Sequence, residues 1–256
     1  MTNINHSERK FFMHPPHKSI GVSTGSVALR ACLPAKPRPA SPRTPPLRLG
    51  MIGFPVSAKS DWIYEVLWAR LKQYGPATCD RLLPIADDDR WDDSYWQSLD
   101  CLILGDWPEM DNINGEAIRR FCRRGGGIVS LGVTGPASDE RTGFDHDVLG
   151  RGLDSSTGER EIPTAIIAAC DDHPVVTDTT PFVANLCRTP QAKIAEDAVT
   201  LLHGLSAQGL APVAWVRRYC GGRVFSTSLG TPQDFGEPEF LRLLGAAIRW
   251  TAGQRT

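Results

Sequence analysis

Short apolar runs alternate with amphipathic stretches along most of the chain, and this pattern predicts an α/β fold. Residues 99–105 form a continuous apolar run between turn residues, which is typical of a parallel strand covered on both faces. Residues 47–54 and 128–132 are predicted as further buried strands, and residues 78–83 as a short one. Amphipathic stretches between them predict helices, so the alternation indicates a doubly wound, mainly parallel sheet of the flavodoxin-like type.

The chain closes with a predicted hairpin and a final helix. Residues 213–219 and 223–228 are rich in aromatic and β-branched side chains, and the turn Cys220-Gly221-Gly222 separates them. Pro238 suits the first turn of the helix that follows, and Gly253 suits its end. Two more strands are predicted at residues 162–170 and 199–202. The apolar face of the closing helix is predicted to comprise Phe240, Leu244, Ala247, Ile248 and Thr251.

Residues 1–46 have a different composition, because prolines recur among Lys, Arg, Ser and Thr. Such a segment predicts a disordered, proline-rich tail, which leaves residues 47–253 as one domain. An alternative is a degenerate twin-arginine export signal, since Arg9-Lys10 precedes an apolar stretch. We therefore expect a cytoplasmic location, with export as the alternative.

Charge and cysteine content exclude several classes of function. The 256-residue chain has a net charge of −1 and a sequence pI of about 6.6, which gives no electrostatic basis for binding nucleic acid or an anionic membrane. Its seven cysteines are scattered without CxxC spacing. This pattern favours reduced, buried thiols over a disulfide framework or a zinc site.

Several short motifs occur in one order along residues 47–253. They include Phe144-Asp145 with Leu149-Gly150, and His173-Pro174. The C-terminal part adds Pro212…Trp215, Gly221-Gly222-Arg223-Val224-Phe225, Leu229-Gly230, Asp234-Phe235 and Trp250…Gly253. In these residues the chain resembles the ThuA-like (trehalose utilisation) family of the class I glutamine amidotransferase-like superfamily. The resemblance implies the fold of that superfamily and a link with carbohydrate utilisation.

The chain departs from these relatives at the positions that carry chemistry. A glutamine amidotransferase needs a nucleophilic Cys on the turn after the strand at residues 128–132, and the sequence there is Leu131-Gly132-Val133-Thr134. This excludes glutaminase chemistry by that route. Thr231 also replaces the family's His after Leu-Gly, and Gly132 stands where a His or Arg is frequent.

Metal binding has weak support in the sequence. His146 lies between two aspartates and His173 follows Asp171-Asp172, but carboxylates beside a loop His are also common on solvated surfaces. No His pair has the helical spacing of a metal motif. We therefore predict neither a metal nor a cofactor.

The remaining polar and aromatic side chains of the loops after the strands predict a ligand site. Ligands of parallel α/β sheets bind where the strands end, and carboxylates, amides and aromatic faces suit a neutral polyhydroxylated molecule. We expect the two carboxylates of this set to be exposed. The predicted substrate-binding residues are Phe54, Ser57, Asp106, Trp107, Thr134, Thr231, Gln233 and Asp234.

Two functions remain open from the sequence. The first is a sugar-binding or accessory domain without amidotransferase activity, whose partner is a small-molecule carbohydrate. The alternative is an enzyme that acts on a disaccharide or keto-sugar derivative, with Asp106 or Asp234 as the acid–base group. A homodimer also remains open.

Overall fold

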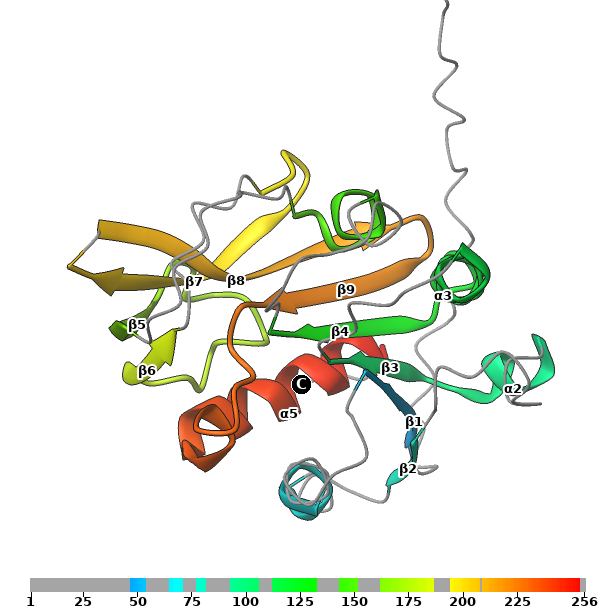
Figure 1. Cartoon of the computed structure of the whole chain (residues 1–256), viewed down its shortest axis with the longest axis horizontal. Helices are drawn as coiled ribbons and strands as arrows, with labels where there is room; N and C mark the ends of the chain where they lie inside the picture. Colours follow the sequence, from blue (N-terminus) through cyan, green and yellow to red (C-terminus); the bar gives the residue numbers. More distant parts are fainter. Residues whose placement is uncertain are drawn as a thin grey trace, which may run out of the picture. The chain divides into compact units, whose positions relative to one another are not determined.

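A computed structural model shows one mixed sheet with helices on its faces (Figure 1). The structure describes residues 47–53, 65–70, 77–81, 93–105, 112–132, 143–151, 162–186, 194–207 and 209–253. All of them lie in the compact unit Leu33–Thr256. The nine strands are ordered β2-β1-β3-β4-β9-β8-β7-β5-β6.

One half of the sheet is parallel. It contains β1 (Leu47–Ile52), β2 (Ala77–Arg81), β3 (Cys101–Leu104), β4 (Gly127–Leu131) and β9 (Gly222–Thr227). Each neighbouring pair in this half is parallel. The chain crosses between these strands through the helical segment 65–70, α2 (Asp93–Ser98) and α3 (Asn112–Arg123).

The other half is antiparallel, so the prediction of a mainly parallel sheet is not confirmed. It contains β5 (Ile162–Ala168), β6 (Phe182–Leu186), β7 (Val199–Ser206) and β8 (Gly209–Tyr219). The predicted hairpin is confirmed, because β8 pairs with β9 in antiparallel register. Only two residues separate β7 from β8, and again β8 from β9, and links this short reverse the chain. Helices between strands were predicted for the first half only, and β6 was not predicted.

Helices cover both faces of the parallel half, and each face has its own hydrophobic core. Alternate residues of β3 and β4 belong to different cores, since Ile103 and Val129 face one side while Leu102 and Ile128 face the other. The first core packs against α5 (Pro238–Thr251). The second packs against α3 and against the π-helical turn η2 (Asp145–Leu149). Figure 1 shows α3 and α5 on opposite sides of β4.

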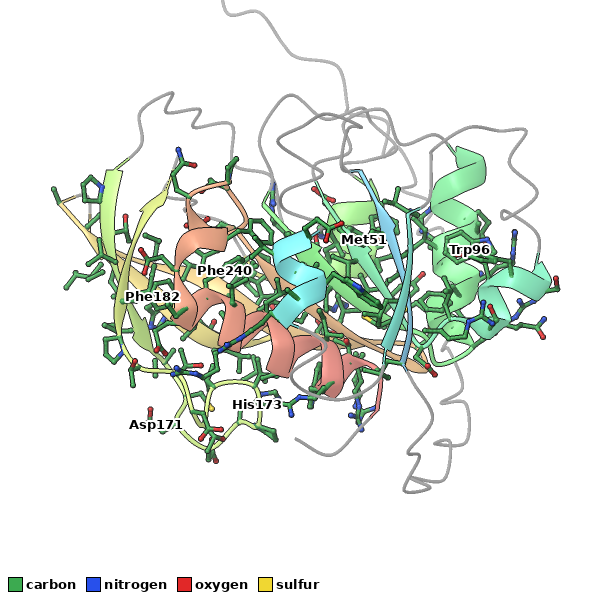
Figure 2. The ribbon with its side chains drawn as sticks, turned by 90° about the horizontal axis from the view of Figure 1, so that it is seen from below. Met51, Trp96, Asp171, His173, Phe182 and Phe240 are labelled. Carbon is green, nitrogen blue, oxygen red and sulfur yellow. The ribbon has the colours of Figure 1, made fainter. Side chains whose placement is uncertain are left out.

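The closing helix follows the predicted pattern. Pro238 occupies its first turn, and Gly253 lies just beyond its end with φ of 80°. Phe240, Leu244 and Ile248 are fully buried against the sheet (Figure 2 labels Phe240). The prediction of a closing helix after the hairpin is therefore confirmed.

Candidate functional site

Four parallel strands end side by side at one edge of the sheet. The register pairs Ile52 with Leu104, Leu104 with Ser130, and Leu131 with Thr227. The chain therefore leaves β1, β3, β4 and β9 at neighbouring positions along this edge, which we call the carboxyl edge. Open α/β sheets bind ligands at such an edge. The predicted ligand-binding residues all belong to loops that follow these four strands, so each of the loops starts at the carboxyl edge.

The exits of β4 and β9 are tied together. The Gly132 N–H donates a hydrogen bond to the Leu229 carbonyl over 2.8 Å. Gly230 has φ of 132°, and a Cβ on it would lie 3.0 Å from the Cβ of Leu131 and 3.1 Å from the Gly132 nitrogen. Only glycine combines this backbone conformation with so close an approach. The two exit loops thus start from one fixed point.

Asp234 holds the loop after β9 in place. Its Oδ2 accepts hydrogen bonds from the N–H groups of Gly230 and Thr231, each over 2.8 Å. The residue is 1% exposed and begins the 3-10 turn η3 (Asp234–Gly236). Burial raises the pKa of this carboxyl, against the opposing effect of the two backbone hydrogen bonds. The expectation of an exposed carboxylate at this position is wrong, because the loop folds back over the side chain.

The other described members of the predicted site lie on the outside of the same loop. Gln233 is exposed and Thr231 is half-buried. The Thr231 Oγ1 lies 3.4 Å from the Asp234 nitrogen. The remaining predicted residues lie outside the described part of the chain, and they are Phe54, Ser57, Asp106, Trp107 and Thr134.

The motif at residues 144–150, which contains η2, receives hydrogen bonds from the hairpin of β8 and β9. The Trp215 Nε1–H donates to the Leu149 carbonyl over 2.8 Å, and the Ser226 hydroxyl donates to the same carbonyl over 3.3 Å. The Arg217 Nη1 donates to the carbonyls of His146 and Asp147. Side chains of β8 and β9 therefore satisfy carbonyls of η2 that its own hydrogen bonds leave open. The motif fixes packing at this position.

His173 belongs to a packed cluster at the opposite edge of the sheet. Its ring contacts Trp250 edge-on at a centroid distance of 5.1 Å, and its Nδ1 accepts a hydrogen bond from the Val175 N–H. Arg223, near the start of β9, lies 5.3 Å from the centre of the Trp250 ring and donates to the Trp250 carbonyl over 2.7 Å. Figure 2 shows the loop with Asp171 and His173 beside α5.

Burial lowers the pKa of His173, and Arg223 lowers it further against the opposing effect of Asp172. The neutral ring is therefore the form that fits this cluster. Within the described residues, no group of three or more His, Cys, Asp or Glu side chains is placed to hold a metal ion. The His146 Nδ1 lies 3.4 Å from Asp147 Oδ1 on an exposed surface.

The two central thiols lie in the cores and not at the carboxyl edge. Cys101 and Cys122 are both fully buried. Burial raises the pKa of each to about 12, so neither forms a thiolate at neutral pH. This confirms the expectation of buried thiols for these two residues.

The sheet order and the helices on its faces make this an α/β protein with a mixed sheet. The chain belongs to the trehalose utilisation (ThuA) family, whose model matches residues 85–251. A ThuA-like protein from Parabacteroides merdae shares the fold with a TM-score of 0.62 at 16% identity, over 83% of this chain and 92% of that one. A cytoplasmic protein from Salmonella typhimurium has a TM-score of 0.57 at 16% identity, over 80% of this chain and 98% of that one.

The fold also occurs inside longer proteins. A β-galactosidase from Rahnella sp. R3 matches 80% of this chain with a TM-score of 0.55 and 15% identity, and the match covers 31% of the enzyme. A comparison with curated protein sequences gives no match. Within the described residues, no helix is long and apolar enough to cross a membrane.

Proposed function

We propose that the chain is a carbohydrate-binding or accessory domain of the ThuA family, with its binding mouth at the carboxyl edge. One observation carries the proposal: four parallel strands end together there, and Asp234 fixes the loop that exposes Gln233. A fixed loop lowers the entropic cost of ordering the side chains that meet a ligand. Asp106, Trp107 and Thr134 are proposed to complete the mouth.

The β-galactosidase match supports the accessory role. There the same fold forms about a third of a carbohydrate-active enzyme, as one part of a longer chain. A fold of this kind can therefore form one part of an enzyme that acts on glycosides. The cytoplasmic location, the homodimer and the boundary at residue 47 remain predictions of the sequence.

A second candidate is an enzyme that acts on a disaccharide or keto-sugar derivative. The observation in its favour is the raised pKa of Asp234, because a general acid works best when its pKa is shifted toward the pH of the reaction. The two backbone hydrogen bonds count against this role, because Oδ2 already accepts both of them from the loop. Asp106 is the other proposed acid–base group. Product formation from trehalose that is lost in Asp106→Asn would support the enzyme.

The binding proposal is tested by isothermal titration of the full chain with trehalose, maltose and glucose. Gln233→Ala should weaken binding of the best ligand about 2- to 12-fold, which corresponds to a hydrogen bond worth roughly 0.5–1.5 kcal/mol. Gln97→Ala is the matched control, because Gln97 is also exposed but lies on α2, just before the amino end of β3. Equal affinity in both variants would place the site elsewhere. Absence of binding by all three sugars would refute the sugar-binding role for this class of ligand.

A further inference from the structure

A hollow lies beside α5, and none of its lining residues belongs to the proposed carbohydrate mouth. It has a volume of about 390 Å³ and lies between the flank of α5 and the turn that connects β5 to β6. Val175, Asp178 and Thr179 line it from the turn, and Arg242, Ala246 and Arg249 line it from the helix. This volume falls within the range of pockets that hold small metabolites.

The helical side of the pocket is built by spacing. Arg242, Ala246 and Arg249 are four and then three residues apart, so they share one stripe of α5. The small side chain of Ala246 leaves the hollow between the two longer ones. Both arginines are half-buried. Less solvent screens a half-buried guanidinium than one in open water, so its attraction for an anion is stronger there, although the carboxylates of Glu239 and Asp178 oppose it.

Arg242 is held in place through one of its nitrogens. Its Nη1 donates to Glu239 Oε1 over 2.7 Å and to Oε2 over 2.8 Å, and it also reaches the Asp178 carbonyl at 3.4 Å. Glu239 in turn accepts a hydrogen bond from the Thr180 N–H. Every hydrogen bond that Arg242 makes within the described part of the chain uses Nη1. The Nε and Nη2 side, a planar two-donor fork, makes none there.

We propose that this pocket binds a small organic oxyanion, that is, a molecule with a phosphate or carboxylate group. The Nε–Nη2 fork of Arg242 matches two oxygens of such a group, and Arg249 adds a second positive charge. Glu239 orients the fork in advance, which reduces the ordering cost of binding. Asp178 and Thr179, across the pocket, suit hydroxyl groups on the rest of the molecule.

The test is titration of the full chain with inorganic phosphate and, separately, with citrate at constant ionic strength. Binding can be followed by calorimetry or by the thermal midpoint. Arg249→Gln removes one of the two positive charges that line the pocket and should weaken binding of the better probe about 10-fold. Arg218→Gln is the matched control, because Arg218 is exposed on β8 and does not line the pocket. The stronger of the two probes identifies the oxyanion as phosphate or carboxylate.

Two further variants separate a built site from general charge attraction. Ala246→Leu fills the hollow without a change of charge and should abolish binding while the protein stays folded. Arg242→Lys keeps the charge but loses the fork, so it should also weaken binding. The proposal is overturned if neither probe binds, if Arg218→Gln weakens binding as much as Arg249→Gln, or if Ala246→Leu binds like the native chain. Because Ala246→Leu leaves every arginine in place, it decides the matter even where an arginine variant fails to fold.

Discussion

A carboxylate avoids the protein interior unless hydrogen bonds replace the water that it loses, and Asp234 meets that condition. Its two acceptor bonds come from consecutive N–H groups of a loop that has no regular partner strand. The side chain therefore holds the backbone of this loop in one conformation. The residue and its loop were predictable from the sequence, but whether the carboxylate supports the loop or contacts a ligand was not. Burial depends on how the loop folds, and residue type does not encode it.

These two hydrogen bonds predict that substitutions of Asp234 lower stability by different amounts. Asp234→Ala removes the acceptor and leaves two N–H groups unsatisfied, which should lower the free energy of unfolding by roughly 1–3 kcal/mol. Asp234→Asn keeps an acceptor oxygen and should cost less. Urea unfolding of the two variants measures both values. Equal stability of Asp234→Ala and the native chain would show that the loop does not depend on this side chain.

The same residue gives a pH dependence of known sign. The pKa of Asp234 is higher in the native state than in the unfolded chain, so the native state holds the proton more tightly. Its contribution to stability is therefore greatest in acid and decreases as the pH rises through the native pKa. Relative to Asp234→Asn, the native protein should lose stability over that rise. A relative gain would contradict the raised pKa.

His173 predicts the opposite trend. Its native pKa is lowered, so its contribution is present above the unfolded pKa of about 6.5 and is lost as the pH falls toward the native pKa. The stability advantage of the native protein over His173→Gln should therefore shrink between pH 7.5 and 5.5 in thermal melts. His146→Gln is the control, because 75% of the His146 side chain is exposed. An advantage that grows in acid would refute the assignment.

The motifs that reveal the family have mainly structural roles where the structure describes them. Trp215 binds a carbonyl of η2, Arg223 contacts the face of Trp250, and His173 packs against its ring. Their order along the chain was enough to predict the family. Their roles could not be predicted, because the contacts join residues that lie up to 77 positions apart.

At the scale of the elements, close packing between α3 and the hairpin explains a glycine of the Gly-Gly-Arg motif. A Cβ on Gly222 would lie 2.3 Å from the Sγ of Cys122 and 2.5 Å from the Gly126 carbonyl oxygen. Distances this short require the helix or the strand to move. The start of β9 therefore approaches α3 as closely as the backbone allows.

Gly222→Ala should destabilise the fold by roughly 1–3 kcal/mol, the usual cost of overpacking a close contact. Gly236→Ala is the matched control, because nothing lies within 4 Å of its Cβ position. That variant should stay within about 0.5 kcal/mol of the native chain, as substitutions on an open surface do. The free energy of unfolding in urea measures both. Similar values for the two variants would mean that α3 can shift without cost.

Elements were predictable where the local pattern was strong. Residues 99–105 and 128–132 gave β3 and β4, and the C-terminal pattern gave the hairpin and α5. The antiparallel half was missed as a topology, because a strand's own sequence does not state its neighbour's direction. β6 was missed altogether, since Phe182–Leu186 is short and ends next to a mixed polar stretch. Direction follows from the connections, and those between β7, β8 and β9 are too short for a crossover.

At the scale of the whole described unit, one sheet separates two cores. Adjacent residues of β3 contribute to both, with Cys101 and Ile103 in the core next to α5 and with Leu102 and Leu104 in the core next to α3. If one core unfolds, the strands that it shares with the other core lose the packing on one of their two faces. The two cores are therefore expected to unfold together, as one cooperative unit.

Two buried cysteines provide a reporter in each core. Cys101 lies in the core next to α5 and Cys122 in the core next to α3, and both have a pKa of about 12 because of burial. Iodoacetamide should leave both unmodified in the native protein and should label them together at the urea midpoint of global unfolding, as measured by mass spectrometry. Cys220, half-buried in the hairpin turn, should react at lower urea and so confirms that the reagent is active. Labelling of Cys122 well before Cys101 would show that α3 detaches first and that the sheet does not couple its two faces.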